Sequence, residues 1–414
     1  MGNLEIGEAL KTQKAILKNK NLVLVGGGHS HAIALLMFGK KPIPGLNLSL
    51  ISDIPQTPYS GMLPGHIAGF YTHDECHIDL KPLSEFAGAK LYIERVTGID
   101  LGNNKVICQS GKEVNFDVLS LDIGSNPATL DVPGATEYAI KAKPIAELLE
   151  NWYQVCREFP STTEPMRIAI VGAGAGGVEL ALSMQANLLR NNRGMLEIHL
   201  LGRDTQLMPS YHPSAGDNLK RVLLSRHIKL HLGENVCRVE QKNCTPDSSL
   251  EFKIICQSGL TLECNKIFWV TQASAPQWVK ATGIKTDEQG FILVNDALQS
   301  LSHPNVFAAG DIATMSNHPL PKAGVFAVRQ GKPLFENLNR YLCGKPLTTY
   351  RPQKQYLSLI GTGDGKAIAT RGGLTLPPHK LLWYWKDWID KAFMKQFSVL
   401  SDIQGQINFE LGRD

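Results

Sequence analysis

Three glycines with the spacing Gly-x-Gly-x-x-Gly, namely Gly172, Gly174 and Gly177, are the residues of this chain best suited to hold a phosphate. In such a pattern the first glycine permits a tight turn, the second lets the backbone approach a ligand, and the third lets a helix pack on a strand. The free N–H groups at the start of that helix then face a negative charge. The pattern predicts a site for the pyrophosphate of a dinucleotide, and a purely structural glycine turn is the alternative.

A second copy of the pattern, near the N-terminus, contains Gly26 and Gly28 but has His31 in place of the third glycine. Ser30 directly precedes that histidine. An imidazole at this position requires either a displaced helix or a side chain turned toward the ligand. Because the two copies occur in one chain, each supports the interpretation of the other as a dinucleotide site.

Both copies lie where a strand pattern gives way to a helical pattern. The expected strand, helix and strand are 21–25, 32–38 and 46–51 in the first unit, and 167–171, 178–189 and 196–201 in the second. This order predicts a βαβ unit with a parallel sheet. The fold class is therefore expected to be α/β, with two Rossmann-like dinucleotide-binding domains.

Three further stretches complete a family pattern. Asp117–Pro127 and Lys266–Pro276 close the two units, and Gly310-Asp311 follows a third apolar run. Together with the glycine turns, they resemble the two-dinucleotide-binding-domain flavoproteins of the pyridine nucleotide-disulfide oxidoreductase superfamily. The resemblance implies that the first fold binds FAD and that an inserted second fold binds NADPH or NADH. It also implies that Asp311 bonds the ribityl–phosphate region of the flavin.

The same resemblance implies how the chain is divided. Residues 21–143 would form the first part of the FAD-binding domain, and residues 144–280 would form the NAD(P)H-binding domain. Residues 281–345 would return to the FAD-binding domain. Residues 346–414 would form a C-terminal region that meets a membrane or a second subunit.

Narrower motifs resemble a subgroup of that superfamily. Gly176–Ala181 and Pro321–Gly331 resemble type II NAD(P)H:quinone dehydrogenases. Gly26–His31, Thr57–Gly65 and Tyr71–Leu80 are similar to a quinone-dehydrogenase-like group that is often fused to a selenide-water dikinase. The resemblance implies a non-proton-pumping enzyme that passes a hydride from NAD(P)H to FAD and electrons on to a quinone. A soluble FAD-dependent NAD(P)H reductase serving selenium or sulfur metabolism is one alternative, and a nucleotide-sensing module without turnover is another.

Position in the family pattern implies roles for individual residues. Glu179 would reach the contact between nicotinamide and flavin, and Gln330 would lie near the electron acceptor. The respective alternatives are a helix charge without chemistry and a hydrogen bonder at the edge of the core. The residues expected to bind FAD are Gly26, Gly28, Ser30, His31, Ser52, Asp53, Tyr59, Ser60, Gly61, Gly124, Gly310, Asp311 and Val325. Those expected to bind the nicotinamide nucleotide are Gly172, Gly174, Gly177, Arg203 and Ala273.

The sequence departs from the family pattern at four of these places. The usual Ala-Thr-Gly strand ends read Asp122-Ile-Gly124 and Thr271-Gln-Ala273. Ser52 replaces the acidic residue expected after the second strand of the first unit. Type II enzymes commonly carry Ala-Gln where this chain has Gly324-Val325, a difference that weighs against a quinone as the acceptor.

The end of the second strand in the second unit predicts the nucleotide preference. Enzymes selective for NADH usually place a carboxylate there, which binds the ribose 2′-hydroxyl. In this chain Gly202 and Arg203 follow the strand pattern. The carboxylate that would repel a 2′-phosphate is therefore missing, and a cation is added. We expect NADPH to be used at least as well as NADH, the alternative being that Arg203 lies over the adenine or faces solvent.

The eight cysteines include no pair with the spacing of a redox disulfide or a zinc knuckle. Cys156 and Cys343 are interpreted as structural, which excludes close analogy with reductases that use paired cysteines beside the flavin. The segment from His73 to His77 has histidines at helical i, i+4 spacing with acids and a cysteine between them. A polar loop beside the flavin is the preferred interpretation of this segment, and no metal is expected.

Composition narrows the function classes further. The net charge of +4 and the lack of a basic block with aromatics argue against nucleic acid as a partner. No run of 18 apolar residues occurs, and the first 20 residues lack the apolar segment of a signal peptide. The protein is expected to be cytoplasmic, either free or held at the cytoplasmic face of a membrane.

The C-terminal segment 380–397 is expected to form an amphipathic helix. At helical spacing one face carries Leu381, Trp385, Trp388, Ile389 and Ala392, and the opposite face carries Lys386, Asp387, Asp390 and Lys391. Tryptophan and lysine suit the headgroup region of a membrane surface. A helix that closes the domain or joins two copies in a homodimer is the alternative.

Overall fold

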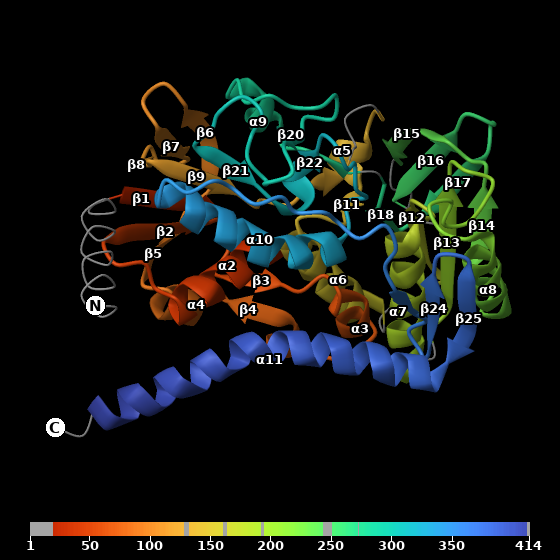
Figure 1. Ribbon diagram of the computed structural model, residues 1–414. Coiled ribbons are helices and arrows are strands. Elements are labelled where there is room, and N and C mark those ends of the chain that lie inside the picture. The colour runs from red at the N-terminus through yellow and green to blue at the C-terminus, as the bar shows by residue number, and fades with distance from the viewer. Residues whose placement is uncertain are drawn as a thin grey trace, which may run out of the picture.

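The computed structural model describes residues 20–127, 132–159, 164–191, 194–242, 251–271 and 273–411. Two parallel five-stranded sheets dominate these residues, with helices packed against them (Figure 1). They confirm the α/β class and the two Rossmann-like units that the glycine turns predict. Residues 1–19, where the sequence predicts no leader, and Cys244 lie outside the described residues.

The first sheet has the strand order β21-β9-β1-β2-β5, and all neighbouring strands are parallel. Its strands are β1 (Lys20–Val25), β2 (Leu46–Ser52), β5 (Ala89–Ile93), β9 (Val118–Leu121) and β21 (Val306–Ala308). The central strands are buried apolar runs, as expected for a parallel sheet covered on both faces. Two of these strands are those predicted as 21–25 and 46–51.

Two parallel helices lie side by side on this sheet: α2 (His29–Lys40), which follows the first glycine turn, and α10 (Gly324–Leu342) (Figure 1). The Ser30 hydroxyl donates to the Ala327 carbonyl over 2.7 Å. One turn further along, a Cβ atom at Gly331 would collide with the side chain of Ile33, so the glycine permits the close approach. Because the helices run in the same direction, their N-termini lie at the same end of the sheet.

The second sheet has the order β11-β18-β12-β13-β14 and is also parallel throughout. Its strands are β11 (Ile140–Lys141), β12 (Met166–Val171), β13 (Leu196–Gly202), β14 (Lys229–Leu232) and β18 (Lys266–Trp269). Helix α7 (Ala175–Asn191) follows the second glycine turn, and α6 (Ile145–Glu158) and α8 (Pro213–Ser225) complete the unit. The chain then returns to the first sheet through β21, so the second unit is inserted in the first.

Antiparallel sheets accompany each unit. They are β6 (Val96–Asp100), β7 (Lys105–Cys108) and β8 (Glu113–Asn115) in the first, and β15 (Val236–Gln241), β16 (Phe252–Cys256) and β17 (Thr261–Cys264) in the second. A two-stranded ribbon of β10 (Asn126–Pro127) and β19 (Ala273–Ser274) links the segments that leave the two parallel sheets. The remaining short elements are β3 (Gln56–Pro58), α3 (Leu63–Ile67), η1 (Asp74–Cys76), β4 (His77–Asp79), α4 (Leu80–Phe86), α5 (Ala135–Tyr138), α9 (Gln277–Ala281), β20 (Ile292–Val294), η3 (Gly310–Ile312) and β22 (Ala313–Met315).

The C-terminal region forms the sheet β23 (Ser358–Gly361), β24 (Ala367–Arg371) and β25 (Leu374–His379), followed by α11 (Lys380–Leu411). Helix α11 runs along the base of the molecule in Figure 1, from β25 past α3 and β4 to α4 and beyond. The expected boundary at residue 397 is therefore wrong, because the helix continues for several more turns.

Candidate functional site

The first glycine turn is shaped by its contact with the end of β9. Gly26 has φ +93°, a left-handed conformation that favours glycine, and a Cβ atom there would collide with the Asp122 carbonyl. The Gly28 N–H donates to the same carbonyl over 3.1 Å. The backbone of the turn is thus held directly against the end of the neighbouring strand.

His31, which replaces the third glycine, is fully buried, and both of its ring nitrogens are bonded within the turn. Nδ1 lies 2.7 Å from the Gly26 carbonyl oxygen and Nε2 lies 2.8 Å from Oγ of Ser120. Burial lowers the pKa of His31 to about 4, so the ring is neutral. Because a carbonyl can only accept, Nδ1 carries the proton and donates it. The imidazole therefore points into the sheet, and neither a displaced helix nor a side chain turned toward a ligand is needed.

Two segments predicted to bind the cofactor meet at the N-termini of α2 and α10. The loop after β3 places the Tyr59 ring 5.4 Å from the His29 ring, and a Cβ atom at Gly324 would meet Ser60 Oγ. The neighbouring Gly61 offers its carbonyl to Lys386 Nζ at 2.6 Å. Tyr59, Ser60 and Gly61 therefore lie beside both helix N-termini, and their expected role in binding FAD stays a prediction.

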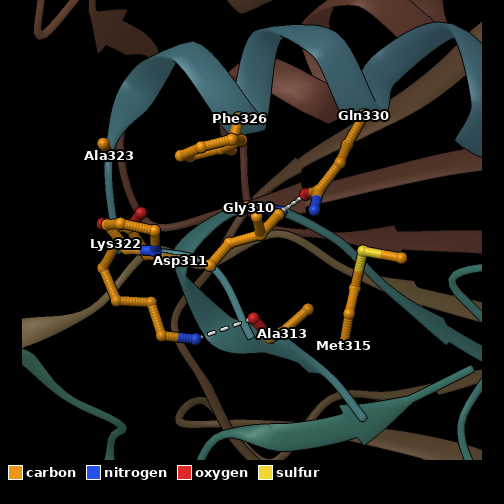
Figure 2. A pocket seen from close by; sticks show the side chains of 10 residues that line it. Gly310, Asp311, Ala313, Met315, Lys322, Ala323, Phe326 and Gln330 are labelled. Carbon is orange, nitrogen blue, oxygen red and sulfur yellow. Dashed lines mark hydrogen bonds between the residues drawn. The ribbon is translucent and has the colours of Figure 1, made fainter. Parts of the chain in front are cut away.

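A small cavity lies beneath the first turns of α10 and contains the Gly-Asp turn (Figure 2). Gln330 is buried, and its Oε1 accepts the Gly310 N–H over 2.7 Å. Gln330 thus positions the Gly-Asp turn, which is the hydrogen-bonding role that sequence reasoning held as its alternative. Its proposed place near an electron acceptor stays a prediction. Val325 lies in the first turn of α10.

Asp311 forms a short ion pair that sequence reasoning missed. Its Oδ2 accepts from Lys143 Nζ at 2.6 Å and from the Ser125 hydroxyl at 3.1 Å. Burial alone would raise the pKa of Asp311, but Lys143 and the hydrogen bonds hold it below its usual value. Lys143 lies nearly 170 residues from Asp311 in the chain, so no local sequence signal links them.

Lys322, just before α10, is a second cation beside the cavity. Its Nζ donates to the Ala313 carbonyl at 2.7 Å (Figure 2). The same Nζ lies 3.9 Å from the centre of the Phe291 ring. Burial lowers the pKa of Lys322 to about 8, although Asp287 and Asp311 oppose that shift. The N-terminus of α10 and this ammonium group place positive charge beside the cavity, which also contains the ionised Asp311.

Unsatisfied polar atoms around the first glycine turn test whether FAD suits the site. Nε2 of His29 and Oγ1 of Thr57 are buried without a hydrogen-bond partner. A Cβ atom at Gly27 would lie 2.7 Å from Oγ1 of Thr57, so this hydroxyl borders the turn. Buried polar groups normally find a partner. A ligand with phosphate and hydroxyl oxygens would supply one, so the residues present fit the polar part of FAD.

The end of β2 forms the outer part of the first site, and one of its two predicted residues is exposed to solvent. Ser52 ends β2 and is buried, its hydroxyl donating to the Ile54 carbonyl, whereas Asp53 is exposed and lies 3.5 Å from Arg95. Gly124 has φ +70° in the segment after β9. Ser52 and Asp53 thus occupy the strand end where a ribose is bound in such folds.

The second glycine turn repeats the backbone geometry of the first. Gly172 has φ +124°, and a Cβ atom there would lie 2.5 Å from the Val270 carbonyl. A Cβ atom at Gly177 would collide with the Gly172 carbonyl, whereas Gly174 is exposed with open space around it. The third glycine therefore serves helix packing and the second leaves room for a ligand, as the pattern predicts.

Two further predicted residues border this second turn. Arg203 is exposed and directly follows Gly202, the last residue of β13. A Cβ atom at Gly202 would lie 2.5 Å from the Cβ of Ala173, inside the glycine turn, so a side chain there would crowd it. Ala273 lies in β19, in the ribbon that joins the two units.

Glu179, in the first turns of α7, contacts the C-terminal region. Its Oε1 accepts the Gly361 N–H at 2.8 Å. Burial raises the pKa of Glu179 to about 7, while Lys386 and the Gly361 N–H act in the opposite direction. Lys386 in turn donates to Asp390 and to the Gly61 carbonyl, each over 2.6 Å. The charge of Lys386 thus acts on Glu179 of the second unit, while its ammonium group bonds the loop beside the first glycine turn.

Helix α11 buries a mixed face, in which Trp383, Met394 and Phe397 accompany the charged Lys386 and Asp390. Lys386 and Asp390 are buried against the protein, and Asp387 accepts from the Tyr71 hydroxyl over 2.8 Å. Large apolar side chains are exposed instead. They are Leu381, Tyr384, Trp385, Trp388 and Ile389, together with Leu374 and Leu376 of the adjoining β25. We call this set the outer apolar face.

Other possible chemical features are not seen in the described part of the chain. None of the cysteines there forms a disulfide, and no group of three or more His, Cys, Asp and Glu side chains there could hold a metal ion. His73 and His77, which flank η1, stack with their ring centres 3.6 Å apart. Among the helices described, none is long and apolar enough to cross a membrane.

The chain is similar in sequence to proteins from animals and bacteria. Ferroptosis suppressor protein 1 of Xenopus tropicalis is 26% identical over 274 residues, which is 66% of this chain and 69% of that protein. An NADH dehydrogenase-like protein of Bacillus subtilis is 22% identical over 380 residues, covering 89% of this chain and 99% of its own.

Two solved structures share the fold. The sulfide:quinone oxidoreductase of Aquifex aeolicus matches with a TM-score of 0.74 at 19% identity, covering 92% of each chain. NDH2 of Plasmodium falciparum in complex with NADH matches with a TM-score of 0.70 at 14% identity, covering 92% of this chain and 98% of that chain.

A family model described as pyridine nucleotide-disulphide oxidoreductase matches residues 20–331. The match includes both glycine turns, the Gly-Asp turn and Gln330. The family implies FAD and NAD(P)H as cofactors, in agreement with the two sites described above. The chain therefore belongs to the pyridine nucleotide-disulphide oxidoreductase family.

Proposed function

We propose that this protein is an FAD-dependent NAD(P)H dehydrogenase that delivers electrons to a quinone at a membrane surface. One observation carries the proposal. Glu179, two residues after Gly177, lies near enough to Lys386 for that ammonium group to lower its pKa, and Lys386 donates to the Gly61 carbonyl beside the N-termini of α2 and α10. The two dinucleotide sites are therefore adjacent, as transfer between a nicotinamide and a flavin requires.

Residues of each unit have separate tasks in this proposal. In the first unit FAD is bound by Gly26, Gly28, the N-terminus of α2 and Asp311. Bound FAD would accept a hydride from the nicotinamide and pass the electrons on. In the second unit the turn around Gly174 binds the pyrophosphate of NAD(P)H. Lys322 and the N-terminus of α10 place positive charge at the flavin end of the site, which favours an anionic bound group.

The outer apolar face supports a lipid-associated acceptor. It is continuous from β25 onto α11 and faces away from the protein, while the buried side of α11 reaches the loop beside the first site. Exposed apolar patches of this kind often mark interaction surfaces. A lipid-soluble quinone approaching along such a surface would reach the flavin without leaving the membrane. The sulfide:quinone oxidoreductase of Aquifex aeolicus, which shares the fold, names a quinone as its acceptor.

Steady-state assays with purified protein test the proposed function. We expect a yellow protein that oxidises NADH or NADPH faster with a short-chain quinone than with oxygen as the acceptor. Flavin released by heat should correspond to about one FAD per chain. Flavin-loaded protein that oxidises neither nucleotide with any quinone would contradict the proposal.

The nucleotide preference follows from β13. Gly202 offers no carboxylate to repel a 2′-phosphate, and exposed Arg203 follows it directly. We expect kcat/KM with NADPH to equal or exceed that with NADH. A charge-assisted hydrogen bond contributes roughly 1.5–3 kcal/mol, so Arg203→Ala should lower kcat/KM for NADPH about tenfold or more and leave the value for NADH nearly unchanged.

Arg238→Ala, which removes an exposed arginine paired with Glu240 on β15, is the matched control and should change neither value. A strong wild-type preference for NADH that persists in Arg203→Ala would show that this loop does not read the 2′-position.

A further inference from the structure

The Asp122 carboxyl group lies in the place where the first site needs hydrogen-bond donors. Its Oδ2 accepts the N–H groups of Ser30 at 2.8 Å and His31 at 3.1 Å, both in the first turn of α2. A Cβ atom at Gly28 or at Gly310 would collide with the same carboxyl group. Asp122 is therefore wedged between the glycine turn and the Gly-Asp turn, next to the expected position of a pyrophosphate.

The surroundings of Asp122 hold little positive charge. On α2, His29 and His31 are neutral above pH 6, because burial lowers the pKa of each to about 4. On the Gly-Asp turn, Asp311 is ionised and already paired with Lys143. From α10 the nearby side chain is the uncharged Gln330. Within the described residues, no lysine or arginine lies within ion-pair distance of Asp122.

We propose that Asp122 belongs to the phosphate site of the bound FAD and takes up one proton from solvent when FAD binds. The proposal rests on the FAD site of the proposed function and concerns how this chain fills that site. An ionised Asp122 would place a third negative charge beside a pyrophosphate that already carries two, in a buried environment where repulsion is strong. A protonated carboxyl removes that charge and can donate its O–H to a phosphate oxygen.

The buried position gives Asp122 a pKa near neutrality, so that FAD binding can change its protonation state. Burial raises the pKa of Asp122 to about 7, although the N–H groups of His31 and Ser30 oppose the shift. The free protein therefore holds the proton only partly at neutral pH, and an adjacent pyrophosphate raises the pKa further. Since FAD then binds the protonated form, its affinity should fall as pH rises above 7, by up to about tenfold per pH unit.

The test is a titration of the full-length apoprotein with FAD at several values between pH 6 and pH 9, followed by flavin fluorescence. We expect the wild-type Kd to rise by roughly 10- to 100-fold across this range. Asp122→Asn, which keeps the shape and an acceptor oxygen without a titratable charge, should bind equally well at pH 6 and at least tenfold more tightly than wild type at pH 9. Asp122→Ala should show the same flat profile if the asparagine variant does not fold.

Asp117→Asn is the matched control. Asp117 precedes the opposite end of β9, where it accepts the Asn21 N–H and pairs with Lys20, so its loss should leave the pH profile unchanged. Calorimetry at pH 8 in two buffers of different ionisation enthalpy should show about one proton taken up by wild type and markedly less by the variant.

Equal pH profiles in wild type and both Asp122 variants would overturn the inference and would assign the dependence to Lys322, which remains in all three. Wild-type apoprotein that binds FAD at no pH would instead contradict the proposed function itself.

Discussion

Purified Asp311→Ala protein is expected to retain far less FAD than wild type. In the proposed site the Asp311 carboxylate, held ionised by Lys143 and Ser125, bonds the ribityl–phosphate region of the flavin. Loss of a buried hydrogen bond to a charged group costs roughly 1.5–3 kcal/mol, which corresponds to a Kd for FAD about 10- to 150-fold higher. Equilibrium dialysis of the apoprotein against FAD would measure the change.

Two variants show whether the effect is local. Asp311→Asn keeps an acceptor for Lys143 and Ser125, so it should bind FAD with intermediate affinity. Glu113→Ala removes the exposed ion pair with Lys105 elsewhere in the same unit and should bind FAD normally. Unchanged FAD affinity in a folded Asp311→Ala protein would mean that the Gly-Asp turn is structural only.

Replacing Trp385 and Trp388 together by glutamate is expected to abolish binding to vesicles of phosphatidylcholine and phosphatidylglycerol. Both side chains belong to the outer apolar face, with Trp388 68% exposed. Burial of one large apolar side chain contributes roughly 1.5–3 kcal/mol, so the double variant should partition into vesicles at least about 100-fold less. Co-sedimentation with vesicles measures this directly.

The same double variant should reduce a long-chain quinone in vesicles poorly and a short-chain quinone in water normally. This separation is expected because Lys386 and Asp390, which hold α11 to the loop beside the first site, are unchanged. Leu301→Glu, at an exposed apolar residue away from α11, is the control and should bind vesicles normally. If the double variant co-sediments like wild type, the outer apolar face contacts a second copy of the chain instead, which sedimentation velocity would reveal.

The sequence predicts the parts of this structure that depend on local patterns. Both glycine turns, the strands that precede them and the helices that follow could be predicted, because the constraint at Gly26 or Gly172 is a backbone conformation that glycine favours. The predicted helices begin a few residues late: α2 starts at His29 and α7 at Ala175. Helix ends depend on capping contacts from distant segments, and here Asp122 supplies such contacts to α2.

The side of α11 that faces the protein could not be predicted. Helical spacing correctly separates the apolar residues from Lys386 and Asp390, but the usual rule buries the apolar face. The structure exposes that apolar face and buries Lys386 and Asp390 together with Trp383, Met394 and Phe397. The Gly61 carbonyl that Lys386 bonds lies more than 300 residues away in the chain, where no periodicity can indicate it.

Several site residues could not be predicted, because their roles depend on contacts between segments that are far apart in the chain. Asp122 was noticed only as a departure from a family pattern, and its role follows from its contact with the start of α2. His29 and Thr57 are identified by unsatisfied buried atoms, which only three-dimensional packing defines. Lys143 becomes a site residue through its ion pair with Asp311.

The central claim is that electrons enter from NAD(P)H at the second site, pass to FAD in the first and leave to a quinone. Double-mixing stopped-flow spectroscopy under anaerobic conditions tests it most directly. The flavin absorbance should be lost after mixing with NADPH or NADH and should return after the second mixing with a short-chain quinone, at a rate no slower than steady-state turnover. Flavin that is reduced by either nucleotide but is not reoxidised by any quinone would contradict the claim.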